Sequence, residues 1–465
     1  MPSCSFLFGY NTDRMLFQAN EACKVLRSFV KQVRECQANT KDGLCVVINS
    51  IVTHTARKQF ARALQFEDGA APDIPFCDDE QPRLLYLHIP FCEELCPYCS
   101  FHRVRLNEAL ARKYHGALRL EMALYRQRGY RFSGIYVGGG TPTVVIDELA
   151  ETLALARELF PVKSLSVETN PNHLTDDNIA VLRQAGVNRL SVGIQTFNDD
   201  LLRKIARYDK YGSGADIAAR LTATRGKFDT LNADMIFNFP EQTRELLEAD
   251  LAVLLDLKMP QITYYPLMVS TLTRRLMAEK LGEVDFRREK TFFNLILRRL
   301  EALYDSSSAW CFARKQAGRQ LIDEYVVDFD EYAGLGSGAI GYVNGVCYAN
   351  TFDIGRYIEE LARRRLPVSA ARRFSAPDRM RYDFLMKLFS TRMNVGDIER
   401  KYDGKFLKSL WKEMAAFTLA GSFRYFPPDL HLTPRGRYLW VIMMREFFIA
   451  VNNFRDFCRK EAGVT

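Results

Sequence analysis

The chain has 465 residues, of which 48% are hydrophobic and 26% charged, so it can form more than one domain and bury a substantial core. Its formal net charge of +8 is modest for this length, and no lysine and arginine block of the nucleic-acid-binding kind stands out. No apolar run is long enough to cross a bilayer, and the N-terminus lacks a secretory pattern. We therefore expect a cytoplasmic protein with no nucleic-acid partner. Its basic surface is either merely solvated or attracts anionic substrates or a membrane surface.

The first part of the chain, residues 1–82, forms an N-terminal extension whose pattern indicates helices and loops. Its last stretch, DGAAPDIPFCDDEQP (68–82), is rich in turn-forming and acidic residues and is typical of a linker. From residue 83 the sequence pattern changes to short runs of strand-forming residues that alternate with helical patterns.

The alternating region predicts strands and helices in turn. The expected strands are residues 84–89, 134–139, 164–169, 189–194, 231–237 and 262–267. The expected helices between them are residues 107–128, 147–160, 175–185, 199–207 and 242–257. This alternation favours βα units around a parallel sheet, and six units are fewer than the eight of a closed barrel. The sequence therefore predicts an α/β fold with a partial (β/α)6 TIM-like barrel.

The remainder of the chain is more helical. A helix-rich stretch begins near residue 284, GLGSGAIGY (334–342) is predicted to be a glycine-rich loop, and the composition becomes helical and basic from about 366. We therefore divide the chain into the N-terminal extension and linker (1–82), an α/β core (83–355) and a helix-rich C-terminal domain (356–465).

A cluster of cysteines lies in LHIPFCEELCPYCSFHR (87–103), where Cys92, Cys96 and Cys99 fall within eight residues. The 11 cysteines of the chain are an odd number at irregular spacing, which in a reducing compartment favours thiols or a metal centre over disulfides. Structural zinc usually takes four ligands in two pairs, but no second pair exists, and Cys77 has no companion. Three thiolates would leave one iron of an iron–sulfur cluster open to a small molecule.

The same run, with the aromatic Tyr98 before its last cysteine, resembles the signature of the radical S-adenosylmethionine (SAM) superfamily. The resemblance implies that Cys92, Cys96 and Cys99 hold a [4Fe–4S] cluster. It also implies that the fourth iron binds the amino and carboxylate groups of SAM. The missing fourth thiolate would thus be replaced by the cofactor.

Six motifs in order narrow the resemblance to the oxygen-independent coproporphyrinogen III oxidase branch, over roughly residues 83–355. They are LYLHIPFC (85–92), YVGGGTPT (136–143), VETNPNHLT (167–175), RLSVGIQTF (189–197), ADMIFNFPEQT (233–243) and YAGLGSGA (332–339). Similarity to the C-terminal domain of that branch is weaker.

The resemblance of these motifs implies which residues of this chain contact the cofactors. Bare glycine backbone after a strand can approach a charged ligand closely, and strand ends of this kind carry ligand sites. The resemblance places Gly139 and Glu168 against the first SAM, and Gly140 and Thr141 against a second SAM. The other implied cofactor contacts are Gln195, Arg207 and Asp234 for the second SAM, with Tyr86, Tyr98 and Ile340 as further matches.

One position departs from the oxidases, which carry a further cysteine two residues after the third. Phe101 stands there instead, which counts against porphyrinogen decarboxylation. The chain looks more like three paralogous groups: the heme chaperones, the anaerobic heme-cleaving enzymes and the class C radical SAM methyltransferases. The chaperones are usually shorter and lack a C-terminal region such as 432–459.

Two further features bear on the substrate. The aromatic and methionine-rich tail YLWVIMMREFFIAV (438–451) is either core, the lining of a hydrophobic pocket or a contact with the membrane surface. His102 is either a structural histidine or a general base.

The resemblance is strongest to class C radical SAM methyltransferases of the menaquinone C8 type. It implies two SAM molecules per chain: one is cleaved to a 5′-deoxyadenosyl radical, which activates the methyl group of the other for addition to an sp2 carbon. The expected partners are an apolar aromatic substrate such as a lipid quinone, met at the inner face of the membrane, and reduced flavodoxin or ferredoxin as electron donor. The alternatives are a coproporphyrinogen III dehydrogenase, an anaerobic heme-degrading methyltransferase and a heme-binding chaperone.

Overall fold

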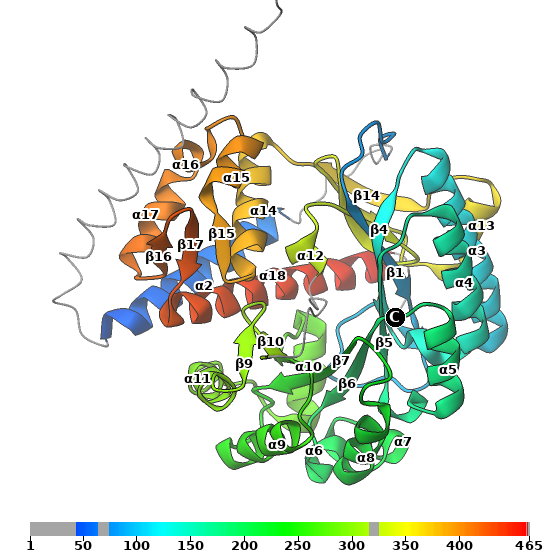
Figure 1. Ribbon diagram of the computed structural model, residues 1–465, viewed down its shortest axis with the longest axis horizontal. Helices are drawn as coiled ribbons and strands as arrows, with labels where there is room; N and C mark the ends of the chain where they lie inside the picture. Colours follow the sequence, from blue (N-terminus) through cyan, green and yellow to red (C-terminus); the bar gives the residue numbers. More distant parts are fainter. Residues whose placement is uncertain (1–42, 64–73, 316–324, 462, 464–465) are drawn as a thin grey trace, which may run out of the picture. The chain divides into compact units, whose positions relative to one another are not determined.

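The computed structural model describes residues 43–63, 74–315, 325–461 and 463 (Figure 1). The predicted helices and loops before residue 43, and the start of the linker, lie outside the described residues. Residues 74–82 contain no helix or strand. Within the described part of the chain, no helix combines the length and apolarity needed to span a membrane.

The described chain forms two compact units. The first contains residues 43–59 and Ser375–Met444, and the second contains Phe60–Phe374 together with the segment that starts at Arg445. Helix α2 (Gly43–Ala63) and helix α18 (Pro434–Glu461) each contribute residues to both units. The three-part division at residues 82/83 and 355/356 stays a prediction.

The second unit is built on a sheet whose central strands are parallel and follow chain order, as predicted. These strands are β1 (Arg83–Ile89), β4 (Phe132–Gly139), β5 (Ser164–Thr169), β6 (Arg189–Gln195), β7 (Thr230–Phe237) and β8 (Gln261–Pro266). Each is buried along most of its length, as a strand covered on both faces must be. Because parallel strands end at one common edge, the residues at their carboxyl ends come together there.

Helices connect these strands. They are α3 (Glu108–Gln127), η1 (Pro142–Val145), α4 (Ile146–Leu159), η2 (Pro171–His173), α5 (Asp176–Gln184), α6 (Asp199–Lys204), α7 (Tyr208–Tyr211), α8 (Gly214–Thr224) and α9 (Arg244–Asp256). Helix α3 begins at its N-cap Asn107, whose side chain accepts a hydrogen bond from the Leu110 amide. Helices α3, α4 and α5 lie side by side along the strands (Figure 1). The sequence did not predict α7 and α8.

Both edges of the parallel sheet are extended, mostly by antiparallel strands. One edge carries β11 (Tyr332–Leu335), which is parallel to β1, and then β12 (Ile340–Val343), β13 (Val346–Asn350) and β14 (Val368–Arg373). The other edge carries β10 (Cys311–Arg314) and β9 (Tyr304–Ser306). The remaining helices of this unit are α10 (Thr271–Leu281), α11 (Glu289–Leu300), α12 (Tyr325–Asp328) and α13 (Ile354–Ala362).

The prediction of a glycine-rich loop over 334–342 is largely wrong, because most of this segment lies in β11 and β12. Glycine is needed there for close packing within the hairpin: a Cβ on Gly334 would lie 2.2 Å from the Ile340 carbonyl oxygen. The turn between the strands contains Gly336 and Gly338, both with positive φ.

A buried carboxyl group holds this hairpin against α3. Glu121 accepts hydrogen bonds from the Gly336 amide (2.8 Å), the Tyr357 hydroxyl (2.6 Å) and the Asn350 side-chain amide (2.7 Å). Burial raises the pKa of Glu121 to about 7, and these three donors only partly oppose the shift.

The Glu121→Gln variant is therefore expected to have a flatter stability profile against pH. The carboxyl favours folding while it is protonated, so its contribution is complete below the ordinary glutamate pKa and is lost as pH rises through about 7. The wild type should lose up to about 3 kcal/mol more than the variant between pH 4.5 and pH 8. Thermal or urea unfolding of both proteins at several pH values measures this, and parallel profiles would contradict it.

The first unit is helical with one small sheet. Its helices include α14 (Ala376–Phe389), α15 (Val395–Lys401), α16 (Phe406–Ser409) and α17 (Trp411–Leu419), and its sheet contains β15 (Arg392–Asn394), β16 (Phe423–Phe426) and β17 (Asp429–Leu432). Trp440 is fully buried here, and its indole N–H donates to the Leu385 carbonyl (3.0 Å). Its ring packs against Phe384 and Phe417. This part of the aromatic tail is therefore core.

Candidate active site

The three cysteines lie on one loop at the carboxyl end of β1. Cys92 ends β2 (Phe91–Cys92), which pairs with β3 (Val104–Arg105), so residues 93–103 form a closed loop between the two short strands. The Arg103 side chain stabilises the loop, since its Nη2 donates hydrogen bonds to the carbonyls of Cys96 (2.6 Å) and Cys99 (2.8 Å). The spacing of the cysteines thus places Cys92 at the start of this loop and Cys96 and Cys99 within it.

The thiols are largely withdrawn from water. Cys92 and Cys96 are each 8% exposed, and Cys99 is half-buried. Burial, followed by the nearby Cys99 thiol, raises the pKa of Cys92 to about 11. Thiolates here need a positive partner, which iron provides. No three or more His, Cys, Asp or Glu side chains of the described residues converge on a single ion.

The glycine motif packs directly against this loop. The Gly140 amide donates to the Ile89 carbonyl (2.7 Å) and the Thr141 amide to the Phe91 carbonyl (2.8 Å). A Cβ on Gly140 would lie 3.0 Å from Cys92 Sγ. Thr141 Oγ1 donates to the same sulfur at 3.6 Å. The glycine backbone that follows β4 therefore lies beside Cys92, where the sequence predicts a cofactor contact.

Glu168 lies next to the same edge, near the end of β5. Its carboxylate accepts a hydrogen bond from the Tyr136 hydroxyl (2.9 Å) and one from the Gly139 amide (3.2 Å). Gly139 has a φ of 118°, which favours glycine, and a Cβ there would strike the His88 ring. The two residues matched to the first SAM are therefore neighbours, although their ligand role stays a prediction.

Arg207 is buried at 4% exposure and contacts the cysteine loop. Its Nη1 lies 3.6 Å from Cys96 Sγ and 3.3 Å from the Tyr98 hydroxyl, and its Nη2 donates to Asn170 Oδ1 (3.1 Å) and to the Gly193 carbonyl. Its Nε is buried and has no hydrogen-bond partner among the described residues. An acceptor on a bound ligand would satisfy this N–H.

The other residues matched to a second SAM meet Arg207 around Gly193 on β6. A Cβ on Gly193 would lie 3.1 Å from Gln195 Nε2 and 3.7 Å from Arg207 Nη2. Asp234, on β7, is the register partner of Gly193 on β6, and its carboxylate accepts hydrogen bonds from the Ser191 hydroxyl and the Asn232 side-chain amide, each at 2.7 Å. Three positions from β6, the start of α7 and β7 are thus adjacent.

The remaining predicted cofactor contacts, Tyr98, Tyr86 and Ile340, differ in their burial and in their neighbours. Tyr98 is buried and packs edge-on against Phe239, while its hydroxyl meets Arg207. Tyr86 is buried beside His88 Nδ1 (2.9 Å). Ile340, at the start of β12, is half-buried and packs against the group that contains Ala349, Phe352 and Phe454.

His102 is fully buried and belongs to the packing beneath the site. Its Nε2 lies 3.2 Å from Ser337 Oγ, and its ring stacks on His88 at 5.8 Å. Burial, and then His88, keep the pKa of His102 well below its usual value. The geometry favours the structural alternative, and a role as general base stays a prediction.

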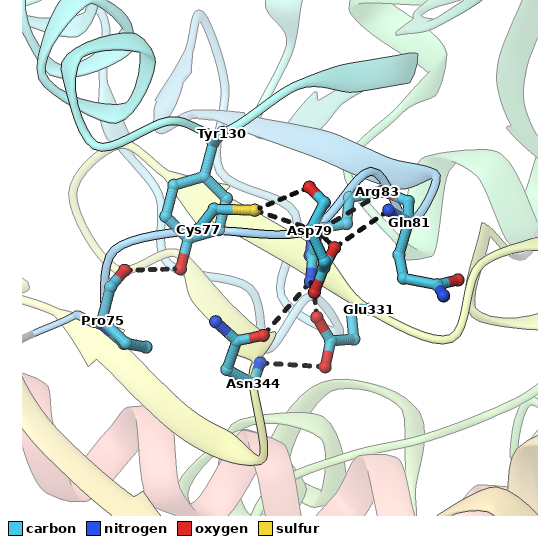
Figure 2. Close-up of polar contacts among 8 residues, drawn as sticks. All are labelled: Pro75, Cys77, Asp79, Gln81, Arg83, Tyr130, Glu331 and Asn344. Atoms are coloured by element: carbon cyan, nitrogen blue, oxygen red, sulfur yellow. Dashed lines mark hydrogen bonds and ion pairs between the residues drawn. The ribbon is translucent and has the colours of Figure 1, made fainter. Parts of the chain in front are cut away.

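Cys77, which sequence reasoning set apart from the cluster, lies in a different polar group (Figure 2). Its sulfur accepts a hydrogen bond from Arg83 Nη1 at 3.2 Å. Arg83 is 2% exposed and also binds Asp79 and Glu331 at 2.7 and 2.8 Å. This group fastens the residue 74–82 segment to the start of β1, so Cys77 has a packing role at the end of the strand opposite the cysteine loop.

Sequence reasoning missed two residues that organise the site. Asn170 is buried and bridges Thr141 Oγ1 (2.7 Å) to Arg207, although it stands inside the VETNPNHLT motif. Asp250 accepts from the Phe197 amide (2.7 Å) and the Thr196 hydroxyl, and so holds the chain just after Gln195. Asp250 lies on α9 outside every motif, so nothing in the sequence marked it.

These features fit an iron–sulfur cluster with a bound SAM. The donor set is three thiols on one loop, of which two are buried and one is half-buried. A glycine edge lies against one of them, and Arg207 offers an unpaired N–H. Residues 86–254 match the Radical SAM superfamily. The heme chaperone HemW of Lactococcus lactis is 30% identical over 288 residues, covering 60% of this chain and 75% of that protein. This chain belongs to the radical SAM superfamily.

Within the superfamily, this radical SAM protein lies in the branch that contains HemN and HemW. The oxygen-independent coproporphyrinogen III oxidase of Bradyrhizobium diazoefficiens is 29% identical over 353 residues, covering 68% of this chain and 74% of the oxidase. The solved structure of coproporphyrinogen III oxidase (HemN) from Escherichia coli superposes with a TM-score of 0.66. It has 21% identity and covers 84% of this chain and 93% of that one. The predicted radical SAM fold is therefore confirmed, and the family implies a [4Fe–4S] cluster and SAM.

Proposed function

We propose that this protein is a radical SAM enzyme whose substrate is a tetrapyrrole. The observation that carries the chemistry is the presence of three thiols, two buried and one half-buried, with the Gly139–Gly140 edge and Arg207 at the carboxyl ends of the parallel strands. The names of its relatives support the substrate class, since they act on coproporphyrinogen III or carry heme. The methylation of menaquinone C8 has no support among these relatives and stays a prediction.

The chain's own residues would divide the work as follows. Cys92, Cys96 and Cys99 would hold the cluster, which together with SAM supplies one-electron radical chemistry. The Gly139 and Gly140 backbone would lie against SAM without steric hindrance. Glu168 would accept hydrogen bonds from SAM hydroxyl or ammonium groups, and Arg207 would bind a carboxylate.

A second SAM remains part of the proposal. Around Gly193 lie one amide, one cation and one carboxylate, from Gln195, Arg207 and Asp234. This arrangement suits the amino acid part of SAM, which carries an ammonium and a carboxylate group. If both sites are used, methyl transfer to a tetrapyrrole carbon becomes available to the enzyme. The alternative function is heme carriage without turnover, which the name of the Lactococcus lactis relative favours.

Anaerobic turnover assays test the function directly. The reconstituted protein would be incubated with SAM and a reductant, together with heme, coproporphyrinogen III or menaquinone in separate reactions. We expect 5′-deoxyadenosine formation that depends on a tetrapyrrole, read by mass spectrometry. A stoichiometric change in heme absorbance without product would favour the carrier. Turnover of menaquinone alone would overturn the tetrapyrrole proposal.

The number of SAM molecules gives a second prediction. Equilibrium binding to the reconstituted wild type should approach two SAM per chain, and Gln195→Ala should lower this toward one. The reason is that Gln195, with its φ of 76°, presents its amide beside Gly193. The control Gln184→Ala removes an exposed amide at the end of α5 and should still bind two. A wild type that binds one SAM and turns over normally would contradict the second site.

A further inference from the structure

Three arginines border the cysteine loop on the side of helix α18. Arg455 and Arg459 are four residues apart, so they project from the same face of the last turns of α18. Arg103 follows the third cysteine in the chain. All three belong to the second compact unit. Arg455 is 8% exposed, and Arg103 and Arg459 are half-buried.

Contacts place Arg103 and Arg455 beside the site. The Arg455 guanidinium lies over the ring of Phe101 at 4.8 Å, and Phe101 is 42% exposed. Arg103 holds the carbonyls of Cys96 and Cys99. The helix itself is tied to the start of α10, because Asn453 accepts from the Thr271 amide at 2.8 Å. Arg455 therefore adjoins an exposed aromatic ring two residues after the third cysteine, and Arg459 follows one turn later on the same face of α18.

Two of these arginines have hydrogen-bond partners in the described chain, since Arg455 donates to Asn452 Oδ1 at 2.9 Å and Arg103 donates to the two cysteine carbonyls. The Arg459 guanidinium donates no hydrogen bond and forms no ion pair among the described residues, and the buried Nε atoms of Arg103 and Arg459 have no hydrogen-bond partner. Asp456 lies one turn earlier on the helix. Burial lowers the pKa of Arg459; Asp456 opposes this effect, and the nearby Arg103 adds to it. A partly buried cation without a partner costs free energy that an anionic ligand would recover.

We propose that Arg103, Arg455 and Arg459 form a binding site for a carboxylate group of the substrate, with Phe101 contacting its ring system. The inference rests on the proposed tetrapyrrole substrate, a class that combines a flat apolar ring with carboxylate side chains. Arginine suits this ligand because its planar fork binds a carboxylate with two hydrogen bonds. The carboxylate of SAM is the other source of the same chemistry, and the experiment separates the two.

The test compares a dicarboxylate tetrapyrrole with its ester. Heme and heme dimethyl ester would be titrated anaerobically into the reconstituted wild type, Arg459→Gln and Lys460→Gln, and SAM binding would be measured on the same samples. We expect the wild type to bind heme at least about tenfold more tightly than the ester. Arg459→Gln should lose about tenfold in heme affinity and almost nothing for the ester. Lys460→Gln removes a positive charge from the exposed neighbouring position and should change neither.

The outcomes are distinct. Equal binding of heme and ester by the wild type, or an equal loss for both in Arg459→Gln, would overturn the carboxylate site. A loss of SAM affinity in Arg459→Gln with heme affinity intact would assign the carboxylate to SAM and overturn the substrate assignment. Failure of the wild type to bind either tetrapyrrole would instead refute the proposed substrate class. Arg459→Lys keeps the charge and should recover part of the heme affinity, which separates lost charge from a folding defect.

Discussion

Replacing Cys96 with alanine is expected to abolish cluster assembly and, with it, the cleavage of SAM. Cys96 is 8% exposed and lies 3.6 Å from Arg207, so its thiolate would be buried against a cation. Alanine offers no ligand, and the loop would keep only two thiolates for iron. We expect iron per chain to fall by about tenfold or more after anaerobic reconstitution. Iron and sulfide analysis measures the cluster, and 5′-deoxyadenosine measures the cleavage.

Two other cysteines serve as controls for this prediction. Cys311 on β10 is also buried, but it contacts Thr263 and lies on a strand outside the cysteine loop. Cys77 belongs to the Arg83 group (Figure 2). Cys311→Ala and Cys77→Ala should both retain the cluster, whereas Cys92→Ala and Cys99→Ala should behave as Cys96→Ala does. A cluster that survives Cys99→Ala but is lost in Cys77→Ala would refute the ligand assignment.

The second large effect is expected from Gly140→Ala. The added Cβ would lie 2.6 Å from the Phe91 carbonyl oxygen and 3.0 Å from Cys92 Sγ. The Phe91 carbonyl already accepts the Thr141 amide at 2.8 Å, so relief requires the backbone and the cysteine loop to move together. We expect a loss of about 2 kcal/mol in the free energy of unfolding, since overpacking of this kind distorts the backbone. Cluster content should fall as well, because Cys92 would be displaced.

A matched glycine tests whether steric crowding is the cause. Gly116 lies within α3, and a Cβ there would meet no atom within 4 Å. Gly116→Ala should therefore raise the free energy of unfolding by up to about 1 kcal/mol, because alanine favours a helix over glycine. Chemical denaturation and iron analysis of both variants measure these opposite effects. Full iron content and unchanged stability in Gly140→Ala would show that the cysteine loop can shift to accommodate the added Cβ, which would contradict this prediction.

The central fold was predictable because its signal is local. Each parallel strand is a short apolar run, and each connecting helix has its own periodicity, so the bounds of β5 agree with the predicted 164–169. The failures have two causes. Helix α8 was missed because it follows two shorter helices, in a connection read as a single one. Parts of β11 and β12 were read as a glycine-rich loop and β14 as the start of a helical domain, because the pairing of these strands lies outside any local pattern.

The cysteine spacing and the ordered motifs determined from sequence alone which family the chain resembles and which residues could meet a cofactor. They did so because a loop of three thiols and a glycine turn are short-range features. Only the tertiary structure showed that Arg207 lies against Cys96, 111 residues away, and that Asn170 joins Arg207 to Thr141. It also brought Arg455 over Phe101. Such contacts depend on the order of strands in the sheet and on the course of α18, which no local pattern encodes.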